Sequence, residues 1–344
     1  MGNGPPRSLL GRRAADRRQR HRYLRRHAVT ILCAGHINWD VTIHVDGLPE
    51  PDGEVQIQQL IQSGGGSAAN VAVGLVGLDV PAALYGSVGG DDTGALALRE
   101  LDRAGVDCGH VVIDPETTTS VKYLVVDAAG EVMVFSNEGA NESFRAVDVD
   151  SDLLSGVDHL HLTGQSPETA SLLAMLASDM GLTVSFDPGR RISERAYGDT
   201  LAATDLLFLN DREAARAEAA GLLTPTDPSD TVVVVKHGGE GAAVHTPTGR
   251  VSHPGFAIEP VDQTGAGDAF AAGFLASVFG GDDSAADGPT GVDTVSPPLD
   301  DAEWYSDALA VGNACGALAA ESMTARTELS WDAIEELLAS HQSE

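Results

Sequence analysis

The stretch Asp262-Gln-Thr-Gly-Ala-Gly-Asp-Ala-Phe270 decides how the rest of the chain is interpreted. Gly265, Ala266 and Gly267 directly precede an apolar run of helical length, so their backbone N–H groups should lie at a helix N-terminus, where they bind anions. Asp268 falls in the first turn of the same helix. An anion cradle beside a fixed carboxylate suits phosphoryl transfer, in which an enzyme positions groups, neutralises charge and accepts a hydroxyl proton. The alternative is a core helix that begins with a glycine turn.

A second glycine-rich turn, Gly64-Gly-Gly-Ser-Ala-Ala-Asn70, opens another helix of small residues. Glycines there let the backbone approach a ligand closely, and Asn70 offers both a donor and an acceptor. The turn does not match GxGxxG, and the chain holds no Gly-Lys dipeptide, which excludes a Walker A loop. A dinucleotide-dependent oxidoreductase is also disfavoured, because Gly35-His-Ile-Asn follows the first strand without the glycines of that fold.

Short apolar runs alternate with helical patterns from Val29 onward, which indicates an α/β fold around a mostly parallel sheet. The predicted strands are 29–35, 160–163, 182–186, 206–209 and 231–236, and the predicted helices are 68–78, 93–104, 167–180 and 212–220. Two stretches, about 41–62 and 120–135, alternate polar and apolar residues around turn signals, so we expect them to form a small antiparallel lid. Gly280–Asp301 lacks periodicity and is expected to be an acidic surface loop.

The charge of the chain is unevenly distributed. Residues 1–28 hold nine arginines and one acid, and residues 29–344 hold 12 basic against 50 acidic side chains. We interpret residues 1–28 as a disordered extension or a misassigned start, and residues 29–344 as one folded domain. An acidic surplus with two lysines indicates a halophilic protein, since molar salt screens self-repulsion. The same charge disfavours nucleic acid as a partner, and no apolar run is long enough for a membrane span.

Three cysteines, Cys33, Cys108 and Cys315, lie far apart without a CxxC pair, which fits a reducing, cytoplasmic compartment and core packing. His159 and His161 alternate on a predicted strand. We expected such alternating side chains to face opposite sides of the sheet and therefore not to form a metal site.

The two glycine segments, with Gly86-Ser-Val-Gly-Gly-Asp-Asp-Thr-Gly94 between them, resemble the signatures of the ribokinase/PfkB family of carbohydrate kinases. The resemblance covers Val29 to about residue 327. It implies a three-layer α/β/α domain with a small β lid, and an ATP-dependent kinase that phosphorylates a primary alcohol of a sugar. Its cofactors would be ATP and Mg²⁺, and the resemblance admits a monovalent cation such as K⁺. Family lids often pair between subunits, so a homodimer through the lid is expected.

Family membership further implies roles for residues that match its motifs. Asp268 would be the general base, and Gly265 to Gly267 would cradle the developing charge. Glu213, through water, and Asn210 would organise Mg²⁺ from an NxxE motif. The implied substrate ligands are Asn38, Asp40, Gly65, Gly66, Asn70, Lys122 and Gln165, and the implied nucleotide ligands are Asn210, Lys236, Gly238, Gly241 and Asn313.

Two departures from the family pattern leave the acceptor open. Ser67 replaces a lysine of ribokinase-like members, and Gln165 stands where some members place an acidic sugar ligand. A free sugar, as in ribokinase, fructokinase or 2-keto-3-deoxygluconate kinase, is our first expectation. A sugar phosphate of the ribose 1-phosphate type or a nucleoside is the alternative. A sugar phosphate would need a cation near the lid, for which Lys122, Arg145 and His44 are the candidates. A non-catalytic sugar-binding regulator is a more distant alternative.

Overall fold

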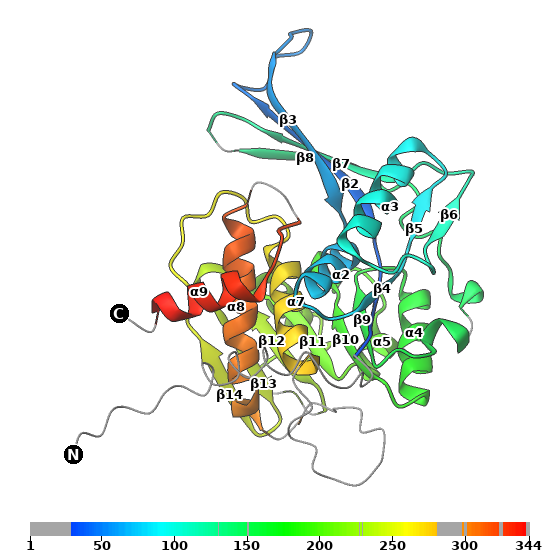
Figure 1. Ribbon diagram of the computed structural model, residues 1–344, viewed down its shortest axis with the longest axis vertical. Coiled ribbons are helices and arrows are strands. Elements are labelled where there is room, and N and C mark those ends of the chain that lie inside the picture. Colours follow the sequence, from blue (N-terminus) through cyan, green and yellow to red (C-terminus); the bar gives the residue numbers. More distant parts are fainter. Residues whose placement is uncertain are drawn as a thin grey trace, which may run out of the picture.

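The computed structural model describes residues 29–129, 131–149, 151–226, 228, 230–280, 298, 301–322 and 326–341. The interpretations of the Arg-rich residues 1–28 and of the acidic loop after Gly280 lie largely outside these residues. Two sheets dominate the described chain, a large central sheet and a smaller one that projects from one of its edges (Figure 1). No helix in the described part of the chain is long and apolar enough to cross a membrane.

The central sheet has eight strands in the order β14-β13-β12-β11-β10-β9-β1-β4. Its strands are β1 (Ile31–Ala34), β4 (Ala82–Tyr85), β9 (His159–Thr163), β10 (Thr183–Asp187), β11 (Leu206–Asn210), β12 (Val232–Lys236), β13 (Ala242–Thr246) and β14 (Gly249–His253). Neighbouring strands from β4 to β12 pair in parallel, and β13 and β14 add two antiparallel pairings at one edge. The expected mostly parallel sheet is therefore confirmed.

Apolar side chains of the sheet alternate between two cores, one on each face. Leu206 and Phe208 of β11 enter the first core and Leu207 and Leu209 enter the second, as successive residues of a buried strand must. The helices are α2 (Ser67–Gly77), α3 (Asp92–Ala104), α4 (Pro167–Asp179), α5 (Gly198–Ala202), α6 (Asp211–Ala219), α7 (Ala266–Phe279), α8 (Ser306–Ala320) and α9 (Trp331–His341). The first core contains α2, α3, α7 and α8, and the second contains α4 and α6, which gives three layers.

The small sheet has the order β3-β2-β7-β8, formed by β2 (Asn38–Val45), β3 (Ile57–Gly65), β7 (Ser120–Val126) and β8 (Val132–Asn137). Both outer pairings are antiparallel and the central β2–β7 pairing is parallel. A separate two-stranded parallel sheet pairs β5 (Ser87–Gly89) with β6 (Val112–Asp114). Because β2 starts just after β1 ends, the small sheet begins at the carboxyl edge of the central sheet. Open α/β sheets bind their ligands at this edge.

One sequence expectation about this fold was wrong. His159 and His161 were expected on opposite faces, but residues two apart on a strand share a face. His159 Nε2 and His161 Nδ1 both lie within hydrogen-bonding distance of Ser185 Oγ, at 2.7 and 2.8 Å. Burial lowers the pKa of both rings, that of His161 to about 4, so they are neutral polar members of the core.

Candidate active site

Two helix starts meet at the carboxyl edge of the sheet, as the two glycine segments predicted. Gly265 caps α7 with φ 79° and Gly66 precedes α2 with φ 95°, a backbone region in which other residues are strained. A Cβ on Gly66 would lie 2.3 Å from the carbonyl oxygen of His36. The helices also pack closely along their length, since a Cβ on Gly74 would lie 2.7 Å from that of Ala272. Small residues thus bring the two N-termini together.

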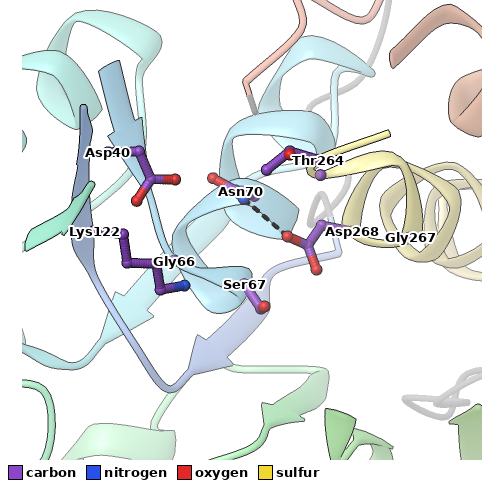
Figure 2. Close-up of a pocket in the computed structure, with 9 residues that line it drawn as sticks. Asp40, Gly66, Ser67, Asn70, Lys122, Thr264, Gly267 and Asp268 are labelled. Atoms are coloured by element: carbon purple, nitrogen blue, oxygen red, sulfur yellow. Dashed lines mark hydrogen bonds between the residues drawn. The ribbon is translucent and has the colours of Figure 1, made fainter. Parts of the chain in front are cut away.

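A pocket of about 240 Å³ opens between these helix starts and the small sheet (Figure 2). Its lining combines both glycine segments with two charged residues of the small sheet. The lining residues are Asp40, Gly66, Ser67, Asn70, Lys122, Thr264, Gly265, Gly267 and Asp268. Ligand pockets range from about 300 Å³ upward, so this small pocket suits a ligand of the size of a sugar.

Asp268 stands in the first turn of α7, and Asn70 holds it from α2. The Asn70 Nδ2 group donates a hydrogen bond of 2.8 Å to Asp268 Oδ2. Burial raises the pKa of Asp268 above its ordinary value, whereas the hydrogen bond from Asn70 and the charge of Lys236 act against that rise. A partly desolvated carboxylate with one oxygen fixed is well suited to accept a proton.

Arg326, which sequence reasoning missed, anchors Asn70 from the far end of the chain. Its Nε donates to Asn70 Oδ1 at 3.3 Å and its Nη2 donates to the Gly65 carbonyl oxygen at 3.0 Å. Its Nη1 lies 3.2 Å from Glu100 Oε1, and both Glu100 oxygens also accept from the Gly64 N–H. The sequence did offer one signal for Arg326. Basic residues are scarce after position 28, so each of them is expected to have a specific partner.

Asp40 and Lys122 face each other across β2 and β7, where they are register partners. Asp40 is buried, and its Oδ1 has no hydrogen-bond partner among the described residues. Burial raises the pKa of Asp40, while the charges of Lys122 and Arg326 oppose that rise. A Cβ on Gly65 would lie 2.2 Å from Asp40 Oδ2, which explains a glycine opposite this carboxylate. Of the three expected cations, Lys122 lines the pocket, and Arg145 and His44 are not among its lining residues.

Asn38 and Gln165 are buried next to this region but outside the pocket lining. Asn38 is 1% exposed and Gln165 is 0% exposed, yet both amide atoms of each side chain lack hydrogen-bond partners within the described chain. Unsatisfied amides are costly to bury. Buried amides without partners in the protein are typical of side chains that hydrogen-bond to a ligand.

The carboxyl ends of β10 to β12 gather a charged group beside the start of α7. Lys236 Nζ lies 2.6 Å from Asp187 Oδ2, and a Cβ on Gly267 would lie 3.4 Å from Lys236 Nζ. Burial acts to lower the pKa of Lys236, but the negative charges of Asp187 and Glu213 outweigh this effect, so the pKa is raised. Asp187 was not predicted, although its position at the end of a buried strand is one that often carries function.

Asn210 and Glu213 form a capping box at the start of α6. Asn210 Oδ1 accepts from the Glu213 N–H, and Glu213 Oε2 accepts from the Asn210 N–H, each at 2.9 Å. Burial and the charge of Asp187 raise the pKa of Glu213. No group of three metal-ligating side chains occurs in the part of the chain that the structure describes. Mg²⁺ keeps most of its waters and needs one or two carboxylates plus substrate phosphates, so Glu213 and Asp187 fit a water-mediated site.

The remaining nucleotide candidates lie outside the Asp268 pocket. Gly238 begins the short 3₁₀ turn η4 (Gly238–Glu240) and Gly241 follows it, and a Cβ on Gly241 would lie 2.0 Å from the carbonyl oxygen of His253. Asn313 is buried in α8, where its Nδ2 donates to the Leu309 carbonyl at 2.7 Å. Gly241 and Asn313 therefore each have a structural role whether or not they also contact a nucleotide.

Comparison with known proteins identifies the family. The model of the pfkB family carbohydrate kinases matches residues 29–332. This chain belongs to that family. The expected fold class and the expected enzyme class, an ATP-dependent carbohydrate kinase, are thereby confirmed.

Individual relatives include kinases with different acceptors. The chain is 49% identical over 312 residues, or 89% of its length, to an ATP-dependent ribose-1-phosphate kinase of Halopiger xanaduensis, of which the match covers 97%. It is 28% identical to a nucleoside kinase of Methanothermobacter thermautotrophicus over 74% of this chain and 84% of the relative. The crystal structure of Thermotoga maritima ribokinase shares the fold, with a TM-score of 0.73, 21% identity and coverage of 91% of this chain and 99% of the ribokinase.

Proposed function

We propose that this kinase transfers the γ-phosphoryl group of ATP to the primary hydroxyl of ribose 1-phosphate. The observation that carries the proposal is the 49% identity, across nearly the whole of both chains, with an ATP-dependent ribose-1-phosphate kinase. The more distant fructokinases and nucleoside kinases share at most 29% identity with this chain. The sugar-phosphate alternative is therefore favoured over the free sugar that the motifs first suggested.

Asp268 would act as the general base. Its carboxylate takes the proton of the acceptor hydroxyl as that oxygen attacks the γ-phosphorus, and the bond between the γ-phosphorus and the bridging oxygen of ADP breaks. The hydrogen bond from Asn70 supports this role because it fixes one carboxylate oxygen. Burial supports it further, since a carboxylate with a raised pKa is a stronger base.

The start of α7 would neutralise the negative charge of the transferring group. The N–H groups of Gly265, Gly267 and Asp268 lie at the first turn of a helix, whose dipole is positive at this end, while the Ala266 N–H donates to the Gln263 carbonyl oxygen at 3.2 Å. Lys236 Nζ, close to Gly267, adds a full positive charge to the same region. Gly238, Gly241 and Asn313 remain candidates for holding the remainder of the nucleotide.

Mg²⁺ bound near Glu213 and Asp187 would supply charge neutralisation between the nucleotide phosphates. Asn210 would contribute indirectly, because its capping box with Glu213 fixes that carboxylate at the start of α6. The positive charge of Lys236 opposes the rise in the pKa of Glu213 that burial and Asp187 cause.

The acceptor would be held by polar groups that the fold leaves without partners. Asn38, Asp40 and Gln165 offer unpartnered buried atoms, Asn70 is bonded to Asp268, and Gly66 lines the pocket. Gly65 is buried outside the pocket lining, and its carbonyl oxygen accepts from Arg326. Lys122 lies opposite Asp40 and offsets its charge.

ADP release in the presence of Mg²⁺ and molar KCl tests the proposal. The acceptors would be ribose 1-phosphate, ribose, fructose, 2-keto-3-deoxygluconate, fructose phosphates and nucleosides. We expect kcat/KM for ribose 1-phosphate to exceed that for every other acceptor. A nucleoside or free sugar as the best acceptor would contradict the proposal, and exchange of KCl for NaCl in the same assay tests for a dependence on K⁺.

We also propose that the lid mediates a homodimer in the cytoplasm of a salt-adapted cell. The small sheet exposes large apolar side chains that nothing in the described chain covers, namely Ile57, Leu60, Tyr123, Val132, Met133, Val134 and Phe135. Phe135 is the register partner of Tyr123, and exposed apolar side chains clustered in this way are typical of a protein interface. Light scattering should give a dimer for the wild type and a monomer for Phe135→Asp, and an unchanged mass for the variant would contradict the lid interface.

A further inference from the structure

Arginines are concentrated after strand β10. Residues 29–344 contain ten arginines, and three of them, Arg190, Arg191 and Arg195, fall within six positions. The 3₁₀ turn η3 (Gly189–Arg191) begins this segment directly beyond Asp187, at the carboxyl edge of the central sheet. In a chain with so few basic residues, such a concentration at the ligand-binding edge calls for a specific anionic partner.

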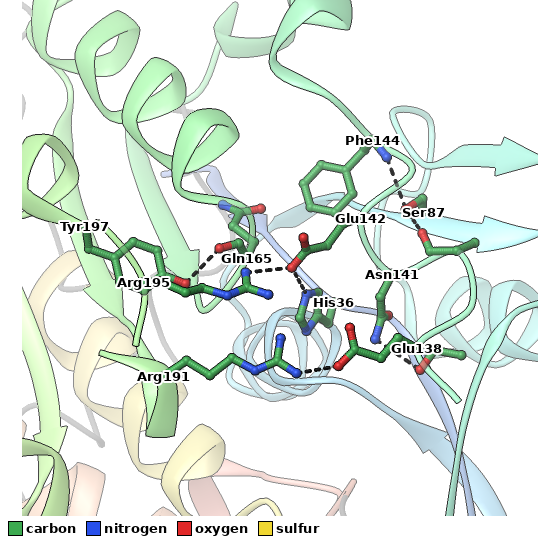
Figure 3. A network of polar contacts seen from close by, with 12 residues as sticks. His36, Ser87, Glu138, Asn141, Glu142, Phe144, Gln165, Arg191, Arg195 and Tyr197 are labelled. Carbon is green, nitrogen blue, oxygen red and sulfur yellow. Dashed lines mark hydrogen bonds and ion pairs between the residues drawn. The ribbon is translucent and has the colours of Figure 1, made fainter. Parts of the chain in front are cut away.

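Arg191 and Arg195 act as a pair. The Arg195 N–H donates to the Arg191 carbonyl oxygen at 3.1 Å, so the two side chains lie one helical turn apart and on the same side. Figure 3 shows both guanidinium groups extending toward His36. Arg195 Nη1 lies 2.7 Å and His36 Nε2 lies 3.4 Å from the same atom, Glu142 Oε1, and Arg191 pairs with Glu138. Three basic side chains therefore surround two carboxylates.

The two carboxylates come from the segment that follows lid strand β8. The Asn141 N–H donates to the Glu138 carbonyl oxygen at 3.1 Å and the Ser143 N–H donates to the Ala140 carbonyl oxygen at 2.9 Å, so Glu138 and Glu142 lie in two successive turns. The Glu138 side chain is 61% exposed, and the Glu142 side chain is 31% exposed. The Glu138 carboxylate is mostly exposed and stays hydrated if it leaves Arg191. The Glu142 carboxylate is more buried, and its hydrogen bonds with His36 and Arg195 lower its pKa to about 2, so it holds these cations as an anion that a phosphate could replace. The carboxylates are thus exchangeable partners of the arginines.

This cluster adjoins the sugar pocket through shared residues. His36 and Asn38 flank Gly66, which lines the Asp268 pocket. Asn38 is the register partner of Ser120, whose Oγ accepts from Asn141 Nδ2 at 3.0 Å. On the other side, the Gln165 carbonyl accepts from Tyr197 Oη at 2.7 Å, and Tyr197 lies beside Arg195. Asn38 therefore lies beside the pocket residue Gly66, Gln165 is bonded to Tyr197 beside the cation cluster, and the amides of both side chains are buried without partners among the described residues.

The chemistry of the cluster fits a phosphate. Arginine binds phosphate through two parallel N–H···O bonds, and two arginines with a histidine offer enough donors for three phosphate oxygens. Gln165 is neutral at a position where some family members carry an acid, so no charge there repels an anion. In a furanose 1-phosphate the phosphate and the primary hydroxyl lie at opposite ends of the molecule. A hydroxyl at Asp268 thus places the phosphate at the other end of the sugar, where it needs a cationic group.

We propose that Arg191, Arg195 and His36 form the subsite for the phosphate of the sugar 1-phosphate, and that this phosphate replaces the carboxylates of Glu138 and Glu142. The inference rests on the proposed function, because it names the residues that distinguish ribose 1-phosphate from ribose. Lys122, which lines the sugar pocket beside Asp40, would then contact the sugar hydroxyls.

Calorimetric titration in molar KCl without ATP tests the subsite separately from turnover. The ligands are ribose 1-phosphate and ribose, and the proteins are the wild type, Arg191→Met, Arg195→Met, Lys122→Met and the control Arg250→Met on the exposed edge strand β14. We expect each of the first two variants to weaken ribose 1-phosphate binding by roughly 10- to 100-fold and to change ribose binding less than twofold. Arg250→Met should bind both ligands as the wild type does.

A second variant has the opposite expected sign and remains informative if an arginine variant fails to fold. Glu142→Gln removes the carboxylate that competes for Arg195 and should tighten ribose 1-phosphate binding several-fold. A purely structural ion pair predicts no such gain. Equal losses for ribose and ribose 1-phosphate, a selective loss only in Lys122→Met, or no gain in Glu142→Gln would overturn the inference. Wild-type binding of ribose 1-phosphate without its phosphorylation would contradict the proposed function and leave the subsite standing.

Discussion

At the scale of single residues, Arg326, Asn70 and Asp268 form a series in which each side chain orients the next. Arg326 fixes the oxygen of the Asn70 amide, so the amide nitrogen must point toward Asp268. The carboxylate is therefore held in place before any substrate binds. Preorganisation of this kind is important because small displacements of a catalytic group are costly in rate.

The central role of Asp268 predicts the effect of one substitution. Asp268→Asn keeps the shape and the hydrogen-bonding capacity of the side chain but removes the base, so kcat should fall by about 10²- to 10⁴-fold while ATP affinity changes little. Steady-state kinetics and ATP titration measure the two effects. Asp92→Asn, which changes an exposed carboxylate in the first turn of α3, should retain wild-type kcat. Wild-type turnover in Asp268→Asn would remove the general-base assignment.

The hydrogen bond between Asn70 and Asp268 predicts a change in pH dependence. The bond stabilises the ionised carboxylate and so lowers its pKa, against the effect of burial. Asn70→Ala removes the bond, so the pKa of Asp268 should rise and the acid limb of the kcat/KM profile should move to higher pH. A profile measured from pH 5 to 9 tests this sign. An acid limb at the wild-type position, or one moved to lower pH, would show that Asn70 does not act on the base.

At the scale of secondary structure, the sequence predicted elements that have uniform patterns and missed those that do not. The apolar runs of β1, β9, β10, β11 and β12 identified the parallel sheet. Strand β14, Gly249–His253, is an exposed polar edge strand and carries no apolar signal. Strand β13 has the mixed sequence Ala-Ala-Val-His-Thr, which gives no clear apolar run, and its Ala242 and Val244 are buried in the first core. Its burial follows from tertiary structure and is not encoded locally.

The same distinction applies to the candidate site. The helix starts at Gly66 and Gly265 are local features, and both were identified from glycine spacing. Arg326 meets Asn70 across 256 positions of sequence, and Glu138 and Arg191 meet across 53 positions. No local pattern specifies such pairings, because they depend on where the sheet order places each strand end.

The capping box of α6 predicts separable effects for its two members. Asn210→Ala removes the N-cap and should reduce the free energy of unfolding by about 1 kcal/mol. Glu213→Gln keeps an oxygen that can accept from the Asn210 N–H but loses its charge, so stability should change less and the Mg²⁺ concentration for half-maximal activity should rise. Thermal unfolding and Mg²⁺ titration measure the two effects. An unchanged Mg²⁺ requirement in Glu213→Gln would restrict Glu213 to a structural role.

At the scale of the whole molecule, charge sets the conditions under which the fold is stable. Residues 29–344 hold 50 acidic and 12 basic side chains, and the Debye length falls from about 10 Å at 0.1 M salt to about 3 Å at 1 M. Screening should therefore raise the melting temperature between 0.1 and 2 M KCl, as measured by circular dichroism. NaCl at equal ionic strength should have the same effect. A melting temperature that stays constant or falls with salt would contradict the halophilic interpretation.

The transfer reaction itself gives the most direct test of the account. Phosphorus NMR of a reaction with ATP, Mg²⁺ and ribose 1-phosphate follows both phosphate positions of the sugar at once. We predict a new phosphomonoester coupled to the two protons of C5, with the C1 phosphate retained and one ADP formed for each ester. Formation of ADP without this ester, or a conversion of ribose or a nucleoside that exceeds that of ribose 1-phosphate, would contradict the account.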